Sequence, residues 1–478
     1  MRLSLSKFAG MTKLLRCLGG ALLLLFIAAA CHDDDDDIPR EVIKTNEWIL
    51  ESMEEIYFWN KLLPDSDPKT EPDSKAYFDK LLYKDDDWSW ITDDYASLQA
   101  EYDGVPVTMG FDVTPVLYSD NVRIFMVVNY VYPGSPAAAA GLKRGDIFVK
   151  VDGQLLTRDN YADVYSKDSY SIEMATVTAN ENEVHIVANG TVRQLTAAVT
   201  KTDPAIHAEV IDTLGYKIGY LAYAEFVAGA NDIFLKTLDD IFTAFKAENI
   251  TELIVDLRYN PGGDLVAAGH LASLIAPKAV VEAGNPLISL QYNDQLQEFF
   301  EGDPEYDDQL HYRLSNLASN ADLKRVYFLT TQGTASASEL VITGLDPYME
   351  VVKVGEATYG KYVGAWLWPD DDEKWCMVPI VMKYRNADGY TDFADGLTPD
   401  YEMYDQVVFM VPLGDTADPM IKTAIEDIAG VPQSVATRSG ARLRSGFTKI
   451  IPQTPEMKLR RNLYVPAVRE LFRPEIQN

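Results

Sequence analysis

The chain has 478 residues, 47% of them hydrophobic, which is enough for two or more domains with packed cores. Its formal charge of −31 excludes nucleic acid or an anionic membrane surface as a direct partner of most of the chain. Five histidines and three cysteines in no metal-ligand spacing predict no metal site, and no cofactor is implied.

The amino terminus has the pattern of a secretory signal. Lys7, Lys13 and Arg16 precede the apolar run 21–30, which is too short to span a membrane and ends in small residues before Cys31. The Ile-Ala-Ala-Ala-Cys ending resembles a bacterial lipoprotein box. The resemblance implies that residues 1–31 are a lipoprotein signal, with either Met1 or Met11 as the start, and that Cys31 is lipidated.

The acidic run from Asp33 to Asp37 has two interpretations of equal weight. It is either a solvated spacer or, as in some Gram-negative lipoproteins, a surface-export signal. We therefore expect a protein held in the cell envelope of a Gram-negative bacterium by a lipid anchor only. The outer membrane is the expected site, on its periplasmic side or at the cell surface.

The remaining cysteines predict no structural disulfide. Cys17 leaves with the signal and Cys31 is acylated, so that Cys376 is alone in the mature chain. Cys376 lies in a strand-like run without a histidine-bearing motif. We interpret it as a buried core thiol rather than a nucleophile.

Residues 32–103 predict the acidic spacer followed by a small helical unit. Apolar side chains recur at helical spacing on one face, and tryptophans are frequent. We expect these aromatic residues to pack the unit onto its neighbour rather than to bind a partner. The helical face comprises Ile49, Met53, Ile56, Tyr57 and Asn60.

Residues 104–201 predict a β-rich domain. Pro133-Gly134-Ser135-Pro136-Ala137 leads through Ala140-Gly141-Leu142-Lys143-Arg144-Gly145-Asp146 into an apolar strand, and this run resembles a PDZ domain. The resemblance implies a carboxylate-binding loop upstream, where backbone N–H groups cap the end of a peptide that adds as a strand. That loop would comprise Met109, Gly110, Phe111, Asp112 and Val113.

Residues 202–430 predict an α/β domain built from βαβ units. A strand at 218–223, an amphipathic helix at 231–247 and a buried strand at 252–257 follow one another. Further on, apolar strands at 326–331 and 351–354 each lead into a polar turn. If these strands are parallel neighbours, Ser336 and Lys361 emerge at one carboxyl edge and face each other.

This pairing suits a serine nucleophile with a lysine base. Ser336 sits at a helix start, where free N–H groups point at an oxyanion formed on the attacked carbonyl. A lysine acts as a base only when it is neutral, a state that burial favours. Tyr359, Tyr362 and Trp366 flank Lys361 and are candidates for an apolar wall.

The run Thr334-Ala335-Ser336-Ala337-Ser338-Glu339 and the turn Gly355-Glu356-Ala357-Thr358-Tyr359-Gly360-Lys361 resemble the Ser-Lys site of the C-terminal processing peptidases, family S41. The resemblance implies that Ser336 is the nucleophile and Lys361 the base. Two positions that often help to hold the lysine differ, since they are Pro347 and Ala365 here. Asp346, one residue early, is a weak candidate for the first of these roles.

The segment Arg258-Tyr259-Asn260-Pro261-Gly262-Gly263 is close to a glycine-rich turn of the same family. The resemblance implies that an N–H of Gly262 or Gly263 completes the oxyanion hole with that of Ala337. Loss of one such donor costs about 2.7–4 kcal/mol in the transition state. His270 is interpreted as a packing residue rather than a catalytic one.

Two later segments lack catalytic signals. Residues 276–324 predict an insertion at the rim of the cleft, whereas the motifs at 396–400 and 413–420 resemble structural segments that close the S41 domain. Residues 431–478 hold nine basic and three acidic residues. This basic tail is either loose or lies across the acidic body, and we favour the second.

The expected fold is therefore multidomain α+β, with an N-terminal helical unit, a PDZ-like β-rich domain and an α/β S41 core. The resemblance implies a serine endopeptidase that cleaves exported polypeptides near their C-terminal ends through an acyl-enzyme. The alternative is a non-catalytic, peptide-binding lipoprotein on an inactive S41 scaffold. The oligomeric state, the natural substrate and any gating by the PDZ-like domain stay open.

Overall fold

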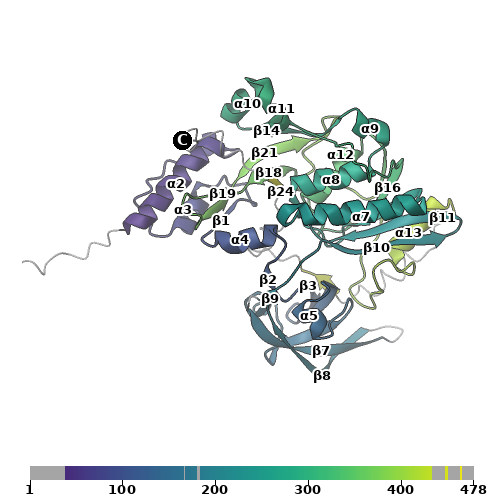
Figure 1. Cartoon of the computed structure of the whole chain (residues 1–478). Helices are drawn as coiled ribbons and strands as arrows, with labels where there is room; N and C mark the ends of the chain where they lie inside the picture. The colour runs from purple at the N-terminus through teal and green to yellow at the C-terminus, as the bar shows by residue number, and fades with distance from the viewer. Residues whose placement is uncertain (1–37, 166, 180–183, 433–446, 451–462, 466–478) are drawn as a thin grey trace, which may run out of the picture.

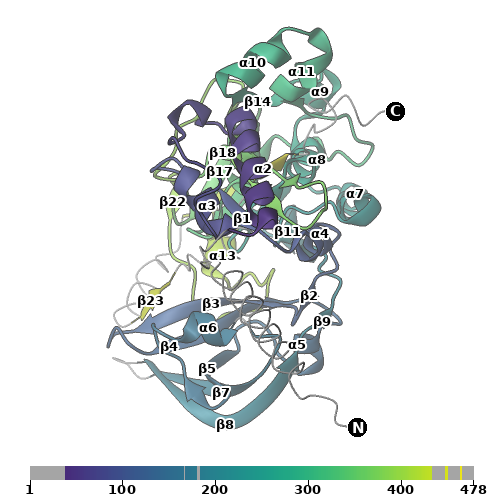
Figure 2. The same ribbon diagram turned by 90° about the vertical axis from the view of Figure 1, so that its left-hand side faces the viewer.

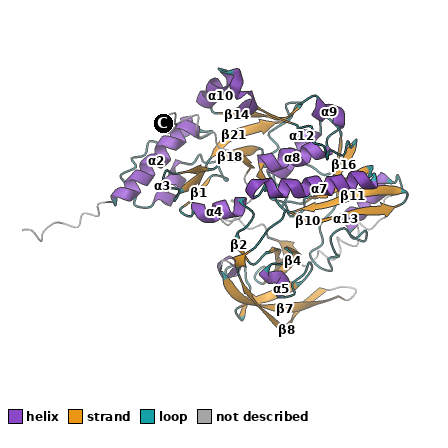
Figure 3. Cartoon of the chain, in the orientation of Figure 1, coloured by secondary structure: helices purple, strands orange, loops and turns teal. Residues whose placement is uncertain are grey.

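The computed structural model describes residues 38–165, 167–179, 184–432, 447–450 and 463–465. Figure 1 shows a helical unit on one side, a strand-rich domain below and a larger domain of sheets and helices. Figure 3 makes the contrast between the last two clear, since long helices lie against the sheets of the larger domain, whereas the strand-rich domain carries short helices such as α5 (Pro136–Ala139). The predicted multidomain α+β fold is confirmed.

The helical unit packs on the large domain rather than on the domain that follows it in the chain. Its members are α2 (Arg40–Ile56), η1 (Asn60–Leu62), α3 (Ser74–Leu81), β1 (Trp90–Thr92) and α4 (Tyr95–Tyr102). Met53 and Ile56 of α2 are fully buried in the same core as the large domain. The expected docking role is confirmed, although Asn60 lies in η1, beyond the end of α2.

The PDZ-like domain is a curved antiparallel sheet, seen edge-on in Figure 2. Its strand order is β23-β3-β4-β5-β7-β8, where β23 is Phe447–Lys449, and β6 pairs with β5. Strands β2 and β9 form a separate two-stranded sheet. The contributing elements are β2 (Val107–Thr108), β3 (Phe111–Tyr118), β4 (Ile124–Val131), α5 (Pro136–Ala139), β5 (Ile147–Val151), β6 (Gln154–Leu155), α6 (Tyr161–Tyr165), β7 (Ser169–Ala179), β8 (Val184–Thr196) and β9 (Ala198–Val199). A separate apolar core holds the domain together.

The large domain contains a central six-stranded sheet in the order β10-β11-β12-β16-β17-β22. All of its neighbouring pairs except β10 with β11 are parallel, which confirms the predicted pairing of the strands before Ser336 and Lys361. The strands are β10 (Ala205–Thr213), β11 (Tyr216–Tyr223), β12 (Glu252–Asp256), β16 (Arg325–Thr330), β17 (Glu350–Gly355) and β22 (Tyr401–Glu402).

Helices cover both faces of the central sheet because its strands are apolar on both sides. Helices α7 (Ile233–Glu248), α8 (Leu265–Ile275) and α12 (Ala337–Leu345) share one core with Val255 and Phe328. Helix α13 (Pro419–Ile428) packs on the opposite face, against Ile254 and Leu329. The short η2 (Ala230–Asp232) precedes α7.

A second six-stranded sheet, in the order β13-β24-β18-β21-β14-β15, lies beside the first. Its strands are β13 (Gly263–Asp264), β14 (Pro286–Tyr292), β15 (His311–Arg313), β18 (Val363–Trp366), β21 (Ile380–Arg385) and β24 (Leu463–Val465). The segment 276–324 supplies the last two strands of this sheet, with β14 pairing with β21 and with the edge strand β15, while its predicted place at the rim of the cleft stays a prediction. The same segment forms α9 (Lys278–Glu282), α10 (Asp294–Glu301), η3 (Pro304–Tyr306) and α11 (Asp307–Leu310).

A three-stranded sheet contains strands from both the helical unit and the large domain. Strand β1 pairs with β20 (Cys376–Val378), which also pairs with β19 (Trp368–Pro369). Cys376 is buried in this region, as predicted for a core residue, and its thiol donates to Met377 O at 3.4 Å. No helix among the described residues is both long and apolar enough to cross a membrane.

The described parts of the basic tail return to the body of the protein. Strand β23 (Phe447–Lys449) pairs with β3 of the PDZ-like domain, and β24 lies between β13 and β18 of the large domain. The signal, Cys31 and the acidic run from Asp33 to Asp37 lie outside the described residues.

Candidate active site

Three turns meet at the carboxyl edge of the central sheet. They follow β12, β16 and β17, which are parallel neighbours, so the turns emerge side by side. The turn after β12 contains Gly262, the next ends at Ser336 and the third ends at Lys361. The structure thus brings together segments that are up to 100 residues apart in the chain.

Hydrogen bonds tie each turn to the next. Ala335 N–H and the Ser338 hydroxyl both donate to Asn260 O, at 3.2 and 3.1 Å. On the other side, Tyr359 N–H donates to Thr334 O at 2.9 Å. Because these bonds are buried, they hold the three turns in one arrangement.

Ser336 is the residue immediately before α12, and its backbone lies at φ 57° and ψ −113°. A non-glycine residue in such a region stores about 1–3 kcal/mol of strain, which is common at functional sites. Its side chain is fully buried, and its hydroxyl has no hydrogen-bond partner among the described residues. The helix start thus presents an uncommitted hydroxyl.

Lys361 is also fully buried, at the end of the third turn and two residues before β18. Burial disfavours an ammonium group relative to a neutral amine. Of the three aromatic residues expected to surround it, Trp366 is buried, whereas Tyr359 and Tyr362 are half-buried. Tyr384 of β21, which the sequence did not single out, contacts the Lys361 backbone directly, since its hydroxyl donates to Lys361 O at 3.1 Å.

The Glu339 carboxylate joins the nucleophile turn to the lysine turn. Its Oε2 accepts the N–H groups of Ser336 and Lys361, each at 2.8 Å. Its Oε1 accepts the Thr358 hydroxyl at 2.5 Å and the Gly360 N–H at 2.6 Å. All four donors lose a partner if this carboxyl group is removed.

Burial raises the pKa of Glu339 to about 7, although its four hydrogen bonds favour the ionised form. The carboxyl group is completely enclosed, on the first turn of α12. The helix N-terminus also favours a negative charge there. Near neutral pH this group therefore changes between a pure acceptor and a carboxylic acid.

The glycine turn lies against Ser336. Gly262 has φ 116°, and a Cβ added to it would come within 2.7 Å of Ser336 Cβ and 3.1 Å of Ala337 N. Its N–H donates to Asn260 Oδ1 at 2.9 Å. Gly262 therefore has its N–H engaged, and Gly263 is the stronger candidate of the two expected donors.

Ala337 occupies the first position of α12, where the N–H has no acceptor within the helix. It follows Ser336 directly and is fully buried. Its N–H thus lies where an oxyanion formed next to Ser336 would require a donor.

The structure does not place Asp346 at this site. Asp346 is exposed at the carboxyl end of α12, whereas Ser336 precedes the first residue of that nine-residue helix. A rise of about 1.5 Å per residue separates the two by about 15 Å. The weak prediction that Asp346 assists Lys361 is therefore wrong, because the helix keeps them at opposite ends.

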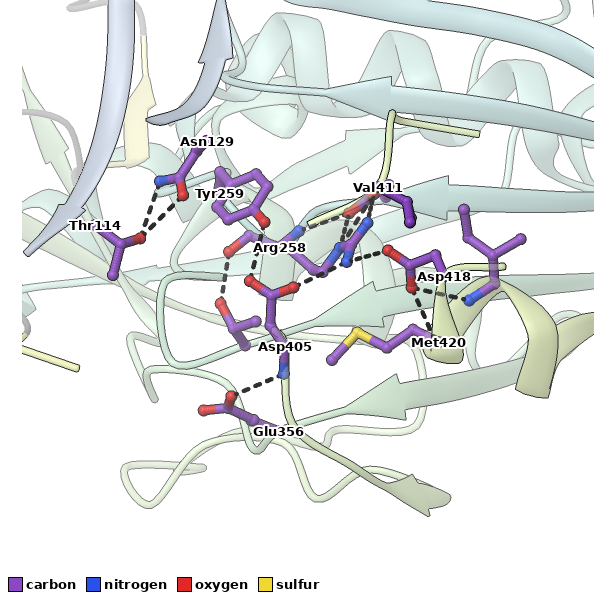
Figure 4. Close-up of polar contacts among 12 residues, drawn as sticks. Thr114, Asn129, Arg258, Tyr259, Glu356, Asp405, Val411, Asp418 and Met420 are labelled. Atoms are coloured by element: carbon purple, nitrogen blue, oxygen red, sulfur yellow. Dashed lines mark hydrogen bonds and ion pairs between the residues drawn. The ribbon is translucent and has the colours of Figure 1, made fainter. Parts of the chain in front are cut away.

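A buried charge network lies behind the glycine turn (Figure 4). The Arg258 guanidinium bonds Asp256 at 2.6 Å, Asp418 at 2.8 Å and Asp405 at 2.9 Å. Although burial opposes ionisation, Arg258 holds the pKa of Asp256 below its usual value. Burial likewise opposes ionisation of Asp405, but Lys449 and two arginines lower its pKa to about 2.

The PDZ-like domain reaches this network through Arg144. Its guanidinium donates to Tyr259 Oη at 3.0 Å and to Asn129 O at 2.8 Å. Tyr259 Oη in turn donates to Asp405 at 2.9 Å. Arg144 belongs to the motif that resembles a PDZ domain, so this motif is connected to the residue next to Arg258.

The predicted peptide-binding loop forms the start of β3. Met109 and Phe111 bury their side chains in the PDZ-like core, and Gly110 has φ 75°. Asp112 and Val113 belong to β3 and pair with β4, and Asp112 accepts a hydrogen bond from Asn129 at 2.6 Å. The loop has the form of a strand start, while its role in binding stays a prediction.

His270 lies away from the three turns, on α8, and contacts Asp239 of α7 at 3.2 Å. This contact fits the packing role expected for it. Within the described residues, no group of three or more His, Cys, Asp or Glu side chains is arranged to hold a metal ion.

Three residues of the site escaped the sequence reasoning. Glu339 and Arg258 stand inside the recognised motifs. Arg258 comes just after an apolar strand and Glu339 just before the apolar residues of a helix, and a charged residue in such surroundings signals a buried ionic role. Tyr384 had no local signal, because its contacts with the Ser336 and Lys361 carbonyls depend on the pairing of β21 with β18.

Comparisons with known proteins give a consistent picture. The profile of peptidase family S41 matches residues 217–403, the peptidase S41 N-terminal domain matches 44–90 and a PDZ domain matches 127–166. The carboxyl-terminal-processing protease of Picosynechococcus sp. is 26% identical over 373 residues, 77% of this chain and 81% of its own length. CtpA of Bacillus subtilis, a carboxy-terminal processing protease, is 23% identical over 270 residues, 56% of this chain and 50% of its own length.

Among solved structures, a candidate S41 protease from Bacteroides fragilis superposes with a TM-score of 0.64 at 26% identity. It covers 80% of this chain and 97% of its own. The matched profiles fall on the helical unit, the PDZ-like domain and the large domain in the same order as along the chain. The chain therefore carries the peptidase domain of family S41, a family of serine proteases, at residues 217–403.

Proposed function

We propose that this protein is a serine endopeptidase that uses Ser336 as nucleophile and Lys361 as general base to cleave exported polypeptides near their C-terminal ends. The observation that carries the proposal is the Glu339 carboxylate, whose Oε2 accepts both the Ser336 and the Lys361 N–H groups. This shared acceptor holds the two turns side by side, with both side chains buried.

In the proposed reaction, the Ser336 hydroxyl attacks the scissile carbonyl carbon while its proton passes to the neutral Lys361 amine. The carbonyl oxygen becomes an oxyanion, which accepts the N–H of Ala337 and that of Gly263. The lysine ammonium then gives its proton to the leaving amine, so that an acyl-serine ester forms. Water, deprotonated by Lys361, releases the new carboxylate and restores the serine.

The binding-only alternative is not favoured. It rested on the two substituted positions, Pro347 and Ala365, yet the glycine turn, the Ser336 turn and the Lys361 turn are hydrogen-bonded to one another. Ala365 lies in β18, paired with β21. Glu339 and Tyr384 supply the contacts that position the Lys361 backbone.

The test compares casein cleavage by the chain starting at His32 with cleavage by Ser336→Ala and Lys361→Ala. We expect each substitution to abolish turnover, by at least about 1,000-fold. The two side chains act as one unit, and circular dichroism should show an unchanged fold. Full activity in either folded variant would rule out the dyad.

We also propose that the protein is anchored to the cell envelope through a lipid on Cys31, on the strength of the signal-like sequence alone. Metabolic labelling with a fatty-acid probe should label the full chain but not Cys31→Ala. Equal labelling of both would contradict the anchor, without bearing on the peptidase proposal.

A further inference from the structure

The C-terminal segment adds a strand to each of two sheets: β23 pairs with β3 at the edge of the PDZ-like sheet, and β24 lies between β13 and β18. Figure 2 shows β23 beside β3 of the PDZ-like domain, and Figure 1 shows β24 beside β18 of the peptidase domain. Strand β24 is parallel to both of its neighbours, with Tyr464 opposite Asp264 on one side and Ala365 on the other.

The glycine turn presents its backbone to β24. Gly262 O and Asp264 N are both bonded to Phe226, at 2.8 and 2.7 Å, on one side of β13. Backbone polar groups alternate along an extended strand, so those of Gly263 point to the opposite side. That side is occupied by β24, where Leu463 is in register with Gly263.

Strand β24 also pairs with β18, the strand that follows Lys361. Strand β18 begins two residues after Lys361, and its Ala365 and Trp366 pair with Tyr464 and Val465. The tail strand therefore lies between the proposed oxyanion donor and the strand that follows the proposed base. A substrate held there by backbone hydrogen bonds would need the same place.

The other tail strand takes the edge of the PDZ-like sheet. Strand β23 pairs antiparallel with residues 116–118 of β3, the strand that follows the predicted carboxylate-binding loop. The Phe447 ring packs edge-on against Tyr118 and Phe125, and Ile450 N–H donates to Pro115 O at 2.9 Å. Antiparallel strand addition at this edge is how PDZ domains take peptides.

Lys449 connects this edge to the lysine turn. Its ammonium lies 3.3 Å from Glu356 and 3.6 Å from Asp405. Glu356 belongs to the turn that ends at Lys361, and Asp405 belongs to the Arg258 network. The basic tail is thus held to the acidic body by charge as well as by strand pairing.

We propose that the tail of this chain is an intramolecular ligand of its own peptidase, with β23 on the PDZ-like edge and β24 in the substrate position between β13 and β18. The inference rests on the proposed function. The structure then represents a self-occupied form, which an extended polypeptide must displace by pairing its backbone with β13 and β18. The competing ligand is recognised through its backbone, as a strand parallel to both.

The test uses Tyr464→Pro, which removes a ladder N–H of β24 and strains its pairing. Thr448→Pro does the same to β23, and Thr437→Pro is the matched control in the tail outside both strands. We expect Tyr464→Pro to raise the initial rate of casein cleavage about tenfold at low substrate, because the competent fraction increases. A synthetic peptide covering residues 459–470, added in trans, should inhibit this variant more than the parent.

Thr448→Pro should raise the rate less, since it releases only the PDZ-like edge, and Thr437→Pro should behave as the parent. Unchanged cleavage by Tyr464→Pro would overturn the inference. If Tyr464→Pro cleaves casein more slowly and unfolds at a lower urea concentration, the inference is also overturned, because β24 would then be a structural strand only.

A second readout does not depend on catalysis. In the Ser336→Ala background, Tyr464→Pro should expose the β18 amides to hydrogen exchange, and the 459–470 peptide should restore their protection. If no form of the chain cleaves casein, the proposed function fails, while this exchange result still decides the occupancy. Unchanged exchange at β18 after Tyr464→Pro would overturn the tail assignment alone.

Discussion

The two six-stranded sheets of the peptidase domain are assembled in different ways. The central sheet takes β10, β11, β12, β16 and β17 in chain order, and all but its first pair are parallel. The second sheet combines strands from residues 263 to 465, and its order does not follow the chain. Ser336 follows a strand of the first sheet, whereas Lys361 leads into a strand of the second.

This difference shows how the site is held. The proposed nucleophile is fixed by local strand-turn-helix geometry, while the proposed base depends on long-range pairing. Glu339 spans the junction, because it lies on α12 and accepts N–H groups from both turns. The junction between sheets is therefore where substitutions should separate activity from stability.

The largest loss of stability is expected from a substitution in the central sheet. Arg258→Ala removes the cation that three buried carboxylates share, although Asp405 keeps Lys449 at 3.6 Å. Breaking such a buried ionic group lowers the free energy of unfolding by about 3–5 kcal/mol. Arg325→Ala is the matched control, because Arg325 pairs with Glu252 at a more exposed position on the same sheet. Loss of the Arg325 side chain should lower the free energy of unfolding by about 1 kcal/mol. Urea unfolding measures both, and equal costs would show that the Arg258 network does not hold the carboxyl edge.

A change at the junction should affect turnover more than folding. Glu339→Gln replaces two acceptor oxygens by one acceptor and one donor, so it loses hydrogen bonds worth about 1.5–3 kcal/mol each. We expect casein cleavage to fall at least tenfold. Thr358→Val, which removes a single donor to the same carboxylate, is the control and should lose less. Equal losses would indicate that the carboxylate does not position Lys361.

The pH dependence of stability provides a separate test of Glu339. Its pKa is about 7 in the folded protein, above the ordinary value of 4.5, so the folded state binds the proton more tightly than the unfolded one. Stability contributed by this group therefore rises as pH falls from about 7 to about 4.5. The difference in unfolding free energy between the wild type and Glu339→Gln should change with this slope. A difference independent of pH would mean that the Glu339 pKa is not raised.

The smallest loss of activity and stability is expected from a substitution in the second sheet. Tyr384→Phe removes a hydroxyl that donates to Ser336 O at 3.3 Å and Lys361 O at 3.1 Å. The ring stays in the core, so the free energy of unfolding should fall by only about 1 kcal/mol. Casein cleavage should fall only a few-fold. A loss as large as that of Glu339→Gln would show that β21, rather than α12, positions the Lys361 turn.

Much of the central sheet and the identity of the turns followed from the sequence. Apolar runs predicted β11, β12, β16 and β17, and the small polar residues after β16 predicted the start of α12 at Ser336. These features depend on interactions within a few residues, so a local pattern is sufficient to specify them. The roles implied for Ser336, Lys361 and Gly263 came from motifs confined to such local turns.

Only the tertiary structure decided which distant groups meet. The resemblance made Asp346 a weak candidate for holding Lys361, yet helix α12 carries it to the end opposite Ser336. Residues 276–324 and the tail had no periodicity that predicted their place in the second sheet, because strand pairing satisfies backbone groups that every residue carries. The sequence by itself determined the chemistry that the turns can perform, whereas the fold determined that Glu339 joins them and that β24 lies between them.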